Sequence, residues 1–227
     1  MKAAARTLAF AAIAPLATCL RAQVPPANVG ATMQEISQAL GVSCTYCHTA
    51  EPGSRQPEPK KEIARAMMAM MRDLNAQIEA AIGKAAAGAA RVECVTCHRG
   101  VVIPRQLVDL VMQTVREKGA ARAVEQYRDL RSRYYGRQAY DFGEDTLIDV
   151  ARRVADARPD EAIALLELNL EFNPKSARSY MALAHAYTRK IDDASAMAAL
   201  EKALEIEPDN GVARGQLEQL KSYHRKR

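Results

Sequence analysis

The pentapeptide CTYCH at residues 44–48 decides how this chain is built, because it recurs as CVTCH at residues 94–98. Each copy holds two cysteines separated by two residues, and a histidine follows the second cysteine directly. Paired cysteines at this spacing occur in zinc centres, in redox disulfides and in sites that hold haem covalently. The histidine that both copies share is the feature that separates these three kinds of site.

A zinc centre and a redox disulfide each leave part of the pattern unexplained. Residues 48–93 separate the two cysteine pairs, which is far more than the roughly 15–20 residues common in zinc ribbons. A thioredoxin-like disulfide needs one cysteine pair beside a βαβ unit, and the sequence predicts no strands. Neither kind of site needs a histidine after both pairs.

Covalent haem needs every residue of the repeated pattern. Two thiols bond the two vinyl groups of the macrocycle, and the adjacent histidine ligates the iron. The sequence therefore predicts two haem c groups. The thioether residues are Cys44, Cys47, Cys94 and Cys97, and the axial ligands from the motifs are His48 and His98.

The N-terminus predicts export from the cytoplasm. Residues 1–22 begin with basic residues, continue in an apolar run and end at Ala22, which is the pattern of a secretory signal. The apolar run from Leu8 to Leu20 contains Pro15 and is shorter than the roughly 20 residues of a membrane span. We expect a periplasmic or otherwise exported protein that is soluble after cleavage. A lipid anchor at Cys19 is the alternative, because LATC loosely matches a lipoprotein signal.

Charge gives no indication of nucleic-acid binding. The chain carries a net charge of +5, but three of its basic residues lie in the signal and no acidic residue offsets them there. The remaining chain is close to neutral, whereas nucleic-acid-binding domains concentrate basic residues on one face. The expected partners are proteins and haem.

Helical segments precede each cysteine motif. The stretch from Val24 to about Gly41 carries Met33, Ile36 and Leu40 at helical spacing, and a second helix follows the proline-rich loop after the first motif. One face of that second helix is apolar. It consists of Ile63, Met67, Met71, Leu74 and Ile78. Four of the nine methionines lie in this helix, and beside a covalent haem a methionine can supply the sixth ligand of the iron.

The stretches MQEISQALGVSCTYCH and MMRDLN…VECVTCHRG…P resemble the cytochrome subunit of photosynthetic reaction centres and its non-photosynthetic relatives. The resemblance covers about residues 28–104. In that family each haem is held by a helix with a methionine ligand, a loop and a Cys-x-x-Cys-His motif. The resemblance therefore implies Met33 as the sixth ligand of the first iron and Met70 as that of the second. Met67 lies three residues before Met70 on nearly the same face and is the alternative. The reaction-centre member carries four haems, whereas this chain has motifs for two.

From residue 105 onward the chain is predicted to be helical and repetitive. Pro174 and Pro208 end two similar segments that are one 34-residue period apart, which is the tetratricopeptide period. The repeat that begins at Ala177 resembles the tetratricopeptide pattern, with Tyr180 where that family prefers tryptophan. Its other matching positions are Leu183, Ala184, Tyr187, Ala196, Leu200 and Ala203. The clearest repeats span about 143–208, and residues 211–223 are expected to cap the array. A plain helical bundle is the alternative.

The fold class predicted is all-α. A signal at 1–22 precedes a small di-haem cytochrome c domain at 23–104, which has little regular structure beyond its haem-flanking helices. A tetratricopeptide-type solenoid follows at 105–227.

With histidine and methionine on both irons, the expected function is electron transfer between protein donors and acceptors rather than catalysis. The repeat domain would bind a partner protein. Three alternatives stay open: a di-haem peroxidase, a haem-based redox or gas sensor with one open iron site, and a scaffold in which haem is only structural.

Overall fold

The computed structural model describes residues 28–49, 58–84 and 90–225, and every element in these ranges is helical. The elements are α1 (Val29–Leu40), the 3-10 turn η1 (Cys44–Tyr46), α2 (Pro59–Ile82), α4 (Cys94–His98), α5 (Leu107–Tyr134), α6 (Glu144–Val154), α7 (Pro159–Phe172), α8 (Ala177–Arg189), α9 (Asp193–Ile206) and α10 (Gly211–Arg225). The all-α fold class is confirmed. Within these ranges no helix has both the length and the apolar character that crossing a bilayer requires. The expected signal, including Cys19, lies outside the described residues.

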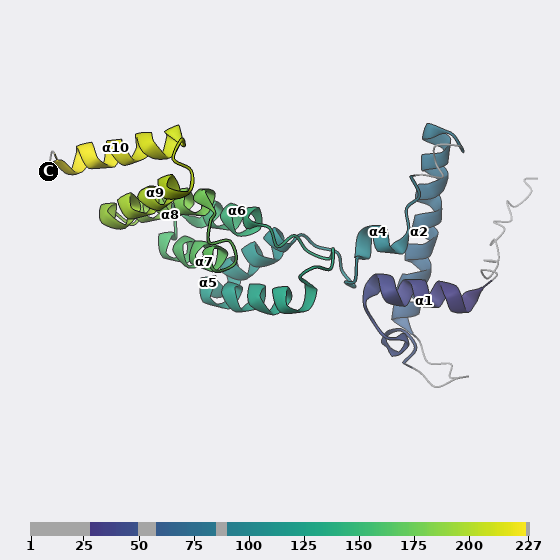
Figure 1. The fold of residues 1–227 in the computed structure, drawn as a ribbon. Helices are drawn as coiled ribbons and strands as arrows, with labels where there is room; N and C mark the ends of the chain where they lie inside the picture. Colours follow the sequence, from purple (N-terminus) through teal and green to yellow (C-terminus); the bar gives the residue numbers. More distant parts are fainter. Residues whose placement is uncertain (1–27, 50–57, 85–89, 226–227) are drawn as a thin grey trace, which may run out of the picture.

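The chain forms two parts that a narrow connection joins (Figure 1). The N-terminal unit contains α1, η1, α2 and α4, with the long helix α2 standing across α1. The repeat domain contains α5 to α10, stacked one after another toward the C-terminus. The residues after α4 lead from one part to the other.

The repeat domain is a series of antiparallel helix pairs. Its first pair is α5, which bends at Gly119 because the φ of 80° at this residue is not helical and favours glycine. The next pairs are α6 with α7 and α8 with α9, and α10 packs on α9 at the end of the array. A stacked array of this kind buries a continuous core between neighbouring pairs, and each pair depends on the next for its stability.

Apolar residues from all the helices of the repeat domain form one core. Tyr127, Leu147, Leu165 and Leu200 are almost fully buried and lie in different helices. A buried polar residue, Asn169 of α7, ties three helices together. Its amide nitrogen donates to the Glu144 carbonyl oxygen of α6 at 3.1 Å and to the Ser179 hydroxyl of α8 at 2.8 Å. Because buried polar groups cost free energy unless they are hydrogen-bonded, these contacts also fix the register of the stack.

The N-terminal unit differs from the repeat domain in how little it buries. Its described residues have three buried side chains, Ala39, His98 and Val101, and α2 has none. Several apolar side chains are exposed to solvent instead: Ile63 is 63 % exposed and Val95 is 52 % exposed. A unit of this size gains little from its own core, and small domains of this kind depend on disulfides, metals or bound groups.

Candidate haem sites

The first cysteine motif is shaped by a short helical turn. The amide of Tyr46 donates to the Ser43 carbonyl at 3.0 Å, and the amide of His48 donates to the Cys44 carbonyl at 3.0 Å. This turn brings residues four apart onto one side, so Cys44 and His48 face the same region. The ammonium of Lys60 lies 3.7 Å from the centre of the Tyr46 ring and connects the start of α2 to the motif.

A cavity of about 480 Å³ lies beside the first motif. It is lined by Cys44, Cys47 and His48 from the motif, and by Met33, Ile36 and Leu40 from α1. Residues of α2 close the other side, namely Lys61, Ala64, Arg65 and Met68. The structure therefore brings Met33 to the same cavity as the motif eleven residues further along the chain.

The lining of this cavity fits a haem. Its thiols, imidazole and thioethers are the donors that covalent attachment and axial ligation use. Its remaining apolar side chains suit the flat macrocycle, and the cations Lys61 and Arg65 suit the two propionates, although they already pair with Glu58 and Glu62. Met68 was not predicted from the sequence, yet it lines the cavity together with Met33.

The second motif forms the short helix α4, which begins with a capping box. The side chain of Glu93 accepts from the Thr96 amide, and the Thr96 hydroxyl accepts from the Glu93 amide at 3.0 Å. His98 at the end of α4 is 9 % exposed, and its Nδ1 lies 3.0 Å from the Val101 carbonyl oxygen. Because a carbonyl can only accept, Nδ1 carries the proton and Nε2 keeps the lone pair that a metal would bind.

The cysteines of the two motifs form no disulfides with one another, and the surroundings of Cys94 favour its protonated form. Burial raises the pKa of Cys94, a hydrogen bond with the backbone lowers it, and the carboxylates of Glu35 and Glu93 raise it again. Within the described part of the chain, no three side chains of histidine, cysteine, aspartate or glutamate gather as a metal cluster. The two motifs thus stand as separate sites, each with its own thiols and imidazole.

Helix α2 contacts the segment that leads into the second motif through one asparagine. The Asn75 amide nitrogen donates to the Val92 carbonyl oxygen at 2.8 Å, and its oxygen accepts from the Val92 amide at 2.8 Å. Met71 lies one turn before Asn75 on the same side of the helix and is half-buried. The predicted ligands Met70 and Met67 are 46 % and 39 % exposed, and neither is among the residues that line the hollow at Cys97.

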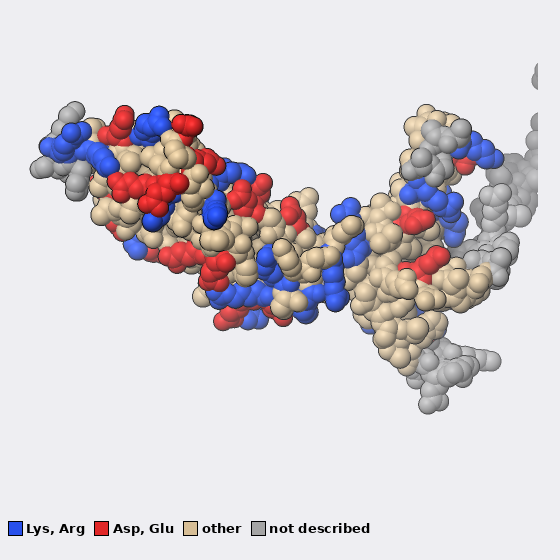
Figure 2. Space-filling model, in the orientation of Figure 1, with Lys and Arg blue, Asp and Glu red and all other residues tan. Residues whose placement is uncertain are grey.

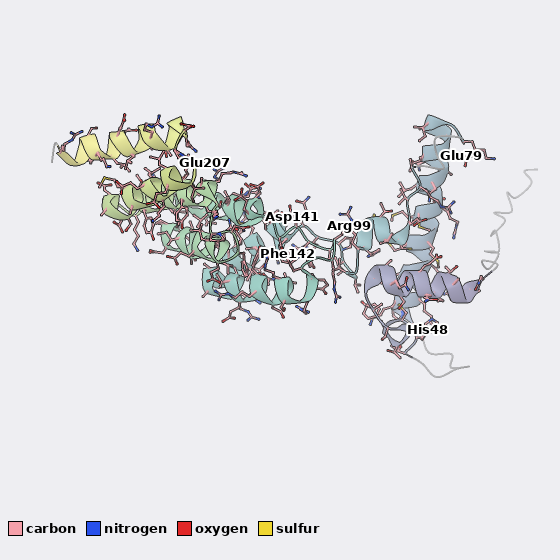
Figure 3. The ribbon with its side chains drawn as sticks, viewed as in Figure 1. His48, Glu79, Arg99, Asp141, Phe142 and Glu207 are labelled. Atoms are coloured by element: carbon pink, nitrogen blue, oxygen red, sulfur yellow. The ribbon has the colours of Figure 1, made fainter. Side chains whose placement is uncertain are left out.

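Close contact between α1 and α4 joins the two motifs in one unit. Gly41 ends α1 with a φ of 66°, and a Cβ at this position would lie 2.3 Å from the Gly100 carbonyl oxygen. The Gly100 amide donates to the Ala39 carbonyl oxygen at 2.7 Å. Helix α1, which belongs to the first motif, therefore packs against the second motif. Figure 3 labels His48 of the first motif and Arg99, which directly follows the second motif.

The fold and the residues at these sites are similar to two kinds of known protein unit, one around the second cysteine motif and one in the helical repeats. Comparison with known families agrees with both parts. Residues 54–142 match the family model of the photosynthetic reaction centre cytochrome C subunit, and residues 177–210 match the tetratricopeptide repeat. The resemblance to these two families, inferred from the residues, is confirmed.

One curated relative adds to the family match. The chain is 37 % identical over 65 residues to cytochrome c-554 of Chloroflexus aurantiacus. The matched stretch covers 29 % of this chain and 15 % of that protein, so the chain matches only a small part of its relative. The likeness supports the cytochrome part of the chain and does not extend to the whole protein.

The family match has different limits from the resemblance inferred from the sequence, which covered about residues 28–104. It begins after the first motif, contains the second, and continues through α5 to Phe142. The evidence for a haem site at the first motif therefore comes from the residues of that motif and from the cavity around it. The likeness also continues past residue 104 into the first helix pair of the repeat domain.

Proposed function

We propose that this chain is an exported di-haem cytochrome c that carries electrons between proteins, with a repeat domain that binds a partner. The observation that carries the proposal is the cavity in which Cys44, Cys47, His48 and Met33 share one lining. Cysteines and a histidine alone are compatible with several sites. A thioether from a separate helix, in the same apolar cavity, is what a haem with two axial ligands needs.

Attachment at each motif is an addition reaction. Each thiol would add across one vinyl double bond of a haem, so that its sulfur bonds one vinyl carbon and its hydrogen goes to the other. Cys44, Cys47, Cys94 and Cys97 form no disulfides, so each has a thiol to supply. No electron acceptor and no leaving group are required.

The axial ligands proposed are His48 with Met33 for the first iron, and His98 with Met70 for the second. Met67 is the alternative to Met70, because the two lie three residues apart on α2 and are similarly exposed. The hydrogen bond from His98 Nδ1 to Val101 supports its role, since a ligating histidine is normally oriented through its other ring nitrogen. A haem bound in this way supplies an iron that cycles between its ferric and ferrous states.

The protein residues set the conditions for this cycling. Apolar side chains such as Ile36, Leu40 and Met68 exclude water from the cavity, and a thioether ligand raises the reduction potential relative to a second imidazole. Because each iron would have both axial positions filled by the protein, no site is left for a substrate. The contact between α1 and α4 supports a short distance between the two haems, which an electron relay needs.

The experiment that tests the proposal is a redox titration of the purified full-length protein, followed by optical spectroscopy. We expect two reversible one-electron steps, low-spin spectra with methionine ligation at both irons, and no binding of carbon monoxide to the reduced protein. Rapid carbon monoxide binding would instead indicate an open iron and favour a peroxidase-like enzyme or a gas sensor. The lack of any reversible step would reduce the haem to a structural role.

Export is the part of the proposal that rests on residues 1–22. Cleavage after Ala22 would leave a chain that begins at Gln23 and carries no lipid. Fractionation of cells that express the full chain should give the mature protein in the periplasm. Recovery from the membrane fraction with a lipid-modified Cys19 would favour the anchored form.

A further inference from the structure

A basic hollow lies where the N-terminal unit meets the repeat domain. We call it the junction hollow; its lining includes Val95, Arg99 and Gly100 from one side and Arg133, Tyr134 and Arg137 from the other. Its volume is about 700 Å³. We propose that an acidic surface of the electron-donating or electron-accepting protein docks in this hollow. The proposal rests on the proposed function, because it names where a redox partner approaches the second haem site.

The charge of the junction hollow favours carboxylates. Three arginines line it and no acidic side chain does. Arg133 forms an ion pair with Asp129, whereas Arg137 forms no ion pair with any residue that the structure describes. Guanidinium groups match carboxylates through paired hydrogen bonds, so uncompensated arginines in a hollow attract acidic side chains. Lys and Arg side chains gather at the narrow neck of the molecule, where Figure 2 shows blue atoms on both sides of the connection.

The position of the junction hollow suits electron transfer at the second motif. Val95 lies between the two cysteines of that motif and is 52 % exposed. Arg99 directly follows the proposed ligand His98, and it lies at the neck in Figure 3. A partner in the hollow would therefore lie beside the second cysteine motif, next to Val95 and Arg99. Apolar Val95 and Tyr134 beside the arginines give the mixed surface that protein partners use.

A second hollow, which also includes Arg99 in its lining, does not offer the same charge. It has a volume of about 520 Å³ and is lined by Cys97, Arg99 and Arg105, together with Asp141, Asp145 and Asp149. Its three carboxylates would repel an acidic partner. Arg99 lines both hollows, but only the junction hollow has no carboxylates in its lining. An acidic partner should therefore bind on the side of Arg133 and Arg137.

The first test uses small redox probes of opposite charge on the haem-loaded full-length protein. Hexacyanoferrate(III) takes one electron from the reduced protein and becomes hexacyanoferrate(II), and stopped-flow absorbance gives the rate. We expect Arg137→Glu to slow this reaction roughly tenfold at low salt, because charges near the site of transfer steer an anion. With cationic tris(1,10-phenanthroline)cobalt(III) as the oxidant, which is reduced to cobalt(II), the same variant should react faster than the unmodified protein. Both differences should disappear near 1 M salt, where screening acts within about 3 Å.

The matched control is Arg214→Glu, which makes the same change in net charge on exposed Arg214 of α10, at the far end of the repeat domain. It should leave the rates with both oxidants within about twofold of the unmodified protein, since steering depends on the local field and falls off within the screening length. Equal slowing by Arg137→Glu and Arg214→Glu would overturn the proposal, because net charge alone would then explain the effect.

The second test does not depend on haem chemistry. Isothermal titration calorimetry at low salt with an octaglutamate peptide should show binding to the full-length protein. Arg137→Glu should weaken that binding at least fivefold, and Arg214→Glu should not change it. One outcome is a protein that carries two haems with reversible redox steps and yet shows neither the charge-dependent rate differences nor binding of the peptide. In that case the docking inference is wrong and the proposed function stands. If the protein carries no haem but binds the peptide through Arg137, the proposed function fails instead.

Discussion

Replacement of Gly41 by alanine tests how the two cysteine motifs are joined. Gly41 lies at the end of α1 with a φ of 66°, and its Cα faces the carbonyl of Gly100 just after the second motif. Gly100 also has a positive φ, of 91°, but a Cβ added there would have no atom within 4 Å. Both alanine variants therefore lose stability because their backbone has a positive φ. Only Gly41→Ala also creates a steric clash, between its new Cβ and the Gly100 carbonyl oxygen.

The expected loss of folding stability follows from these distances. Alanine in a left-handed conformation costs about 1–2 kcal/mol, which both variants lose. In Gly41→Ala the new Cβ would lie 2.3 Å from the Gly100 oxygen, so α1 and α4 must separate. Overpacking typically costs about 1–3 kcal/mol, and loss of the Gly100–Ala39 hydrogen bond contributes to it. We expect Gly41→Ala to lose about 1–3 kcal/mol more stability than Gly100→Ala.

The assay is guanidinium unfolding of the haem-loaded protein, followed by haem absorbance so that the N-terminal unit is observed separately from the repeat domain. The midpoint should fall further for Gly41→Ala than for Gly100→Ala, while the far-ultraviolet transition of the repeat domain stays unchanged. Equal midpoints for the two variants would refute the close approach of α1 to the second motif.

Three further predictions address other contacts. Asn75→Ala should destabilise the N-terminal unit by about 1–3 kcal/mol in the same unfolding assay, because two hydrogen bonds to Val92 are lost; an unchanged midpoint would contradict them. Leu166→Ala should destabilise the repeat domain by about 2–5 kcal/mol by circular dichroism and leave the haem transition in place; a parallel shift of both transitions would show that the two parts unfold together. Asp192→Ala should lower the thermal midpoint at pH 7, and the difference should shrink as pH falls below about 4.

The sign of the Asp192 effect follows from its contacts. Hydrogen bonds from the Ser195 hydroxyl and then the Ser195 amide lower the pKa of the Asp192 carboxyl in the folded protein. A lowered pKa adds stability above the ordinary pKa of aspartate, and that stability is lost as pH falls through the folded value. A difference in thermal midpoint that persists unchanged at pH 2 would contradict this reasoning.

Regular patterns in the sequence predicted the helices well. The 34-residue spacing of Pro174 and Pro208 corresponds to α6–α7 and α8–α9, because each repeat places a proline after its second helix. The helical character expected from residue 105 onward is found in α5, whose two halves lie on either side of Gly119. Local propensity and periodicity determine such elements, so the sequence is sufficient for them.

The packing of the N-terminal unit could not be predicted in the same way. Periodicity showed that one face of α2 is apolar, but Ile63 and Leu74 of that face are exposed, while Met68 on an adjacent face lines the cavity at the first motif. A pattern of apolar residues does not say what covers them. The contacts of Asn75 and Gly41 join residues far apart in the chain, and an asparagine inside a helix gives no local signal of such a partner.

We expect the chain to bind two haems covalently, one at each motif. Mass spectrometry of the purified, signal-cleaved protein under denaturing conditions tests this attachment, after expression in a host that exports the chain and attaches haem c. We expect a single species with the mass of the chain from Gln23 plus two haems, which falls by one haem in the Cys94→Ala/Cys97→Ala variant. A species without added mass, with free thiols at Cys44, Cys47, Cys94 and Cys97, would contradict the account.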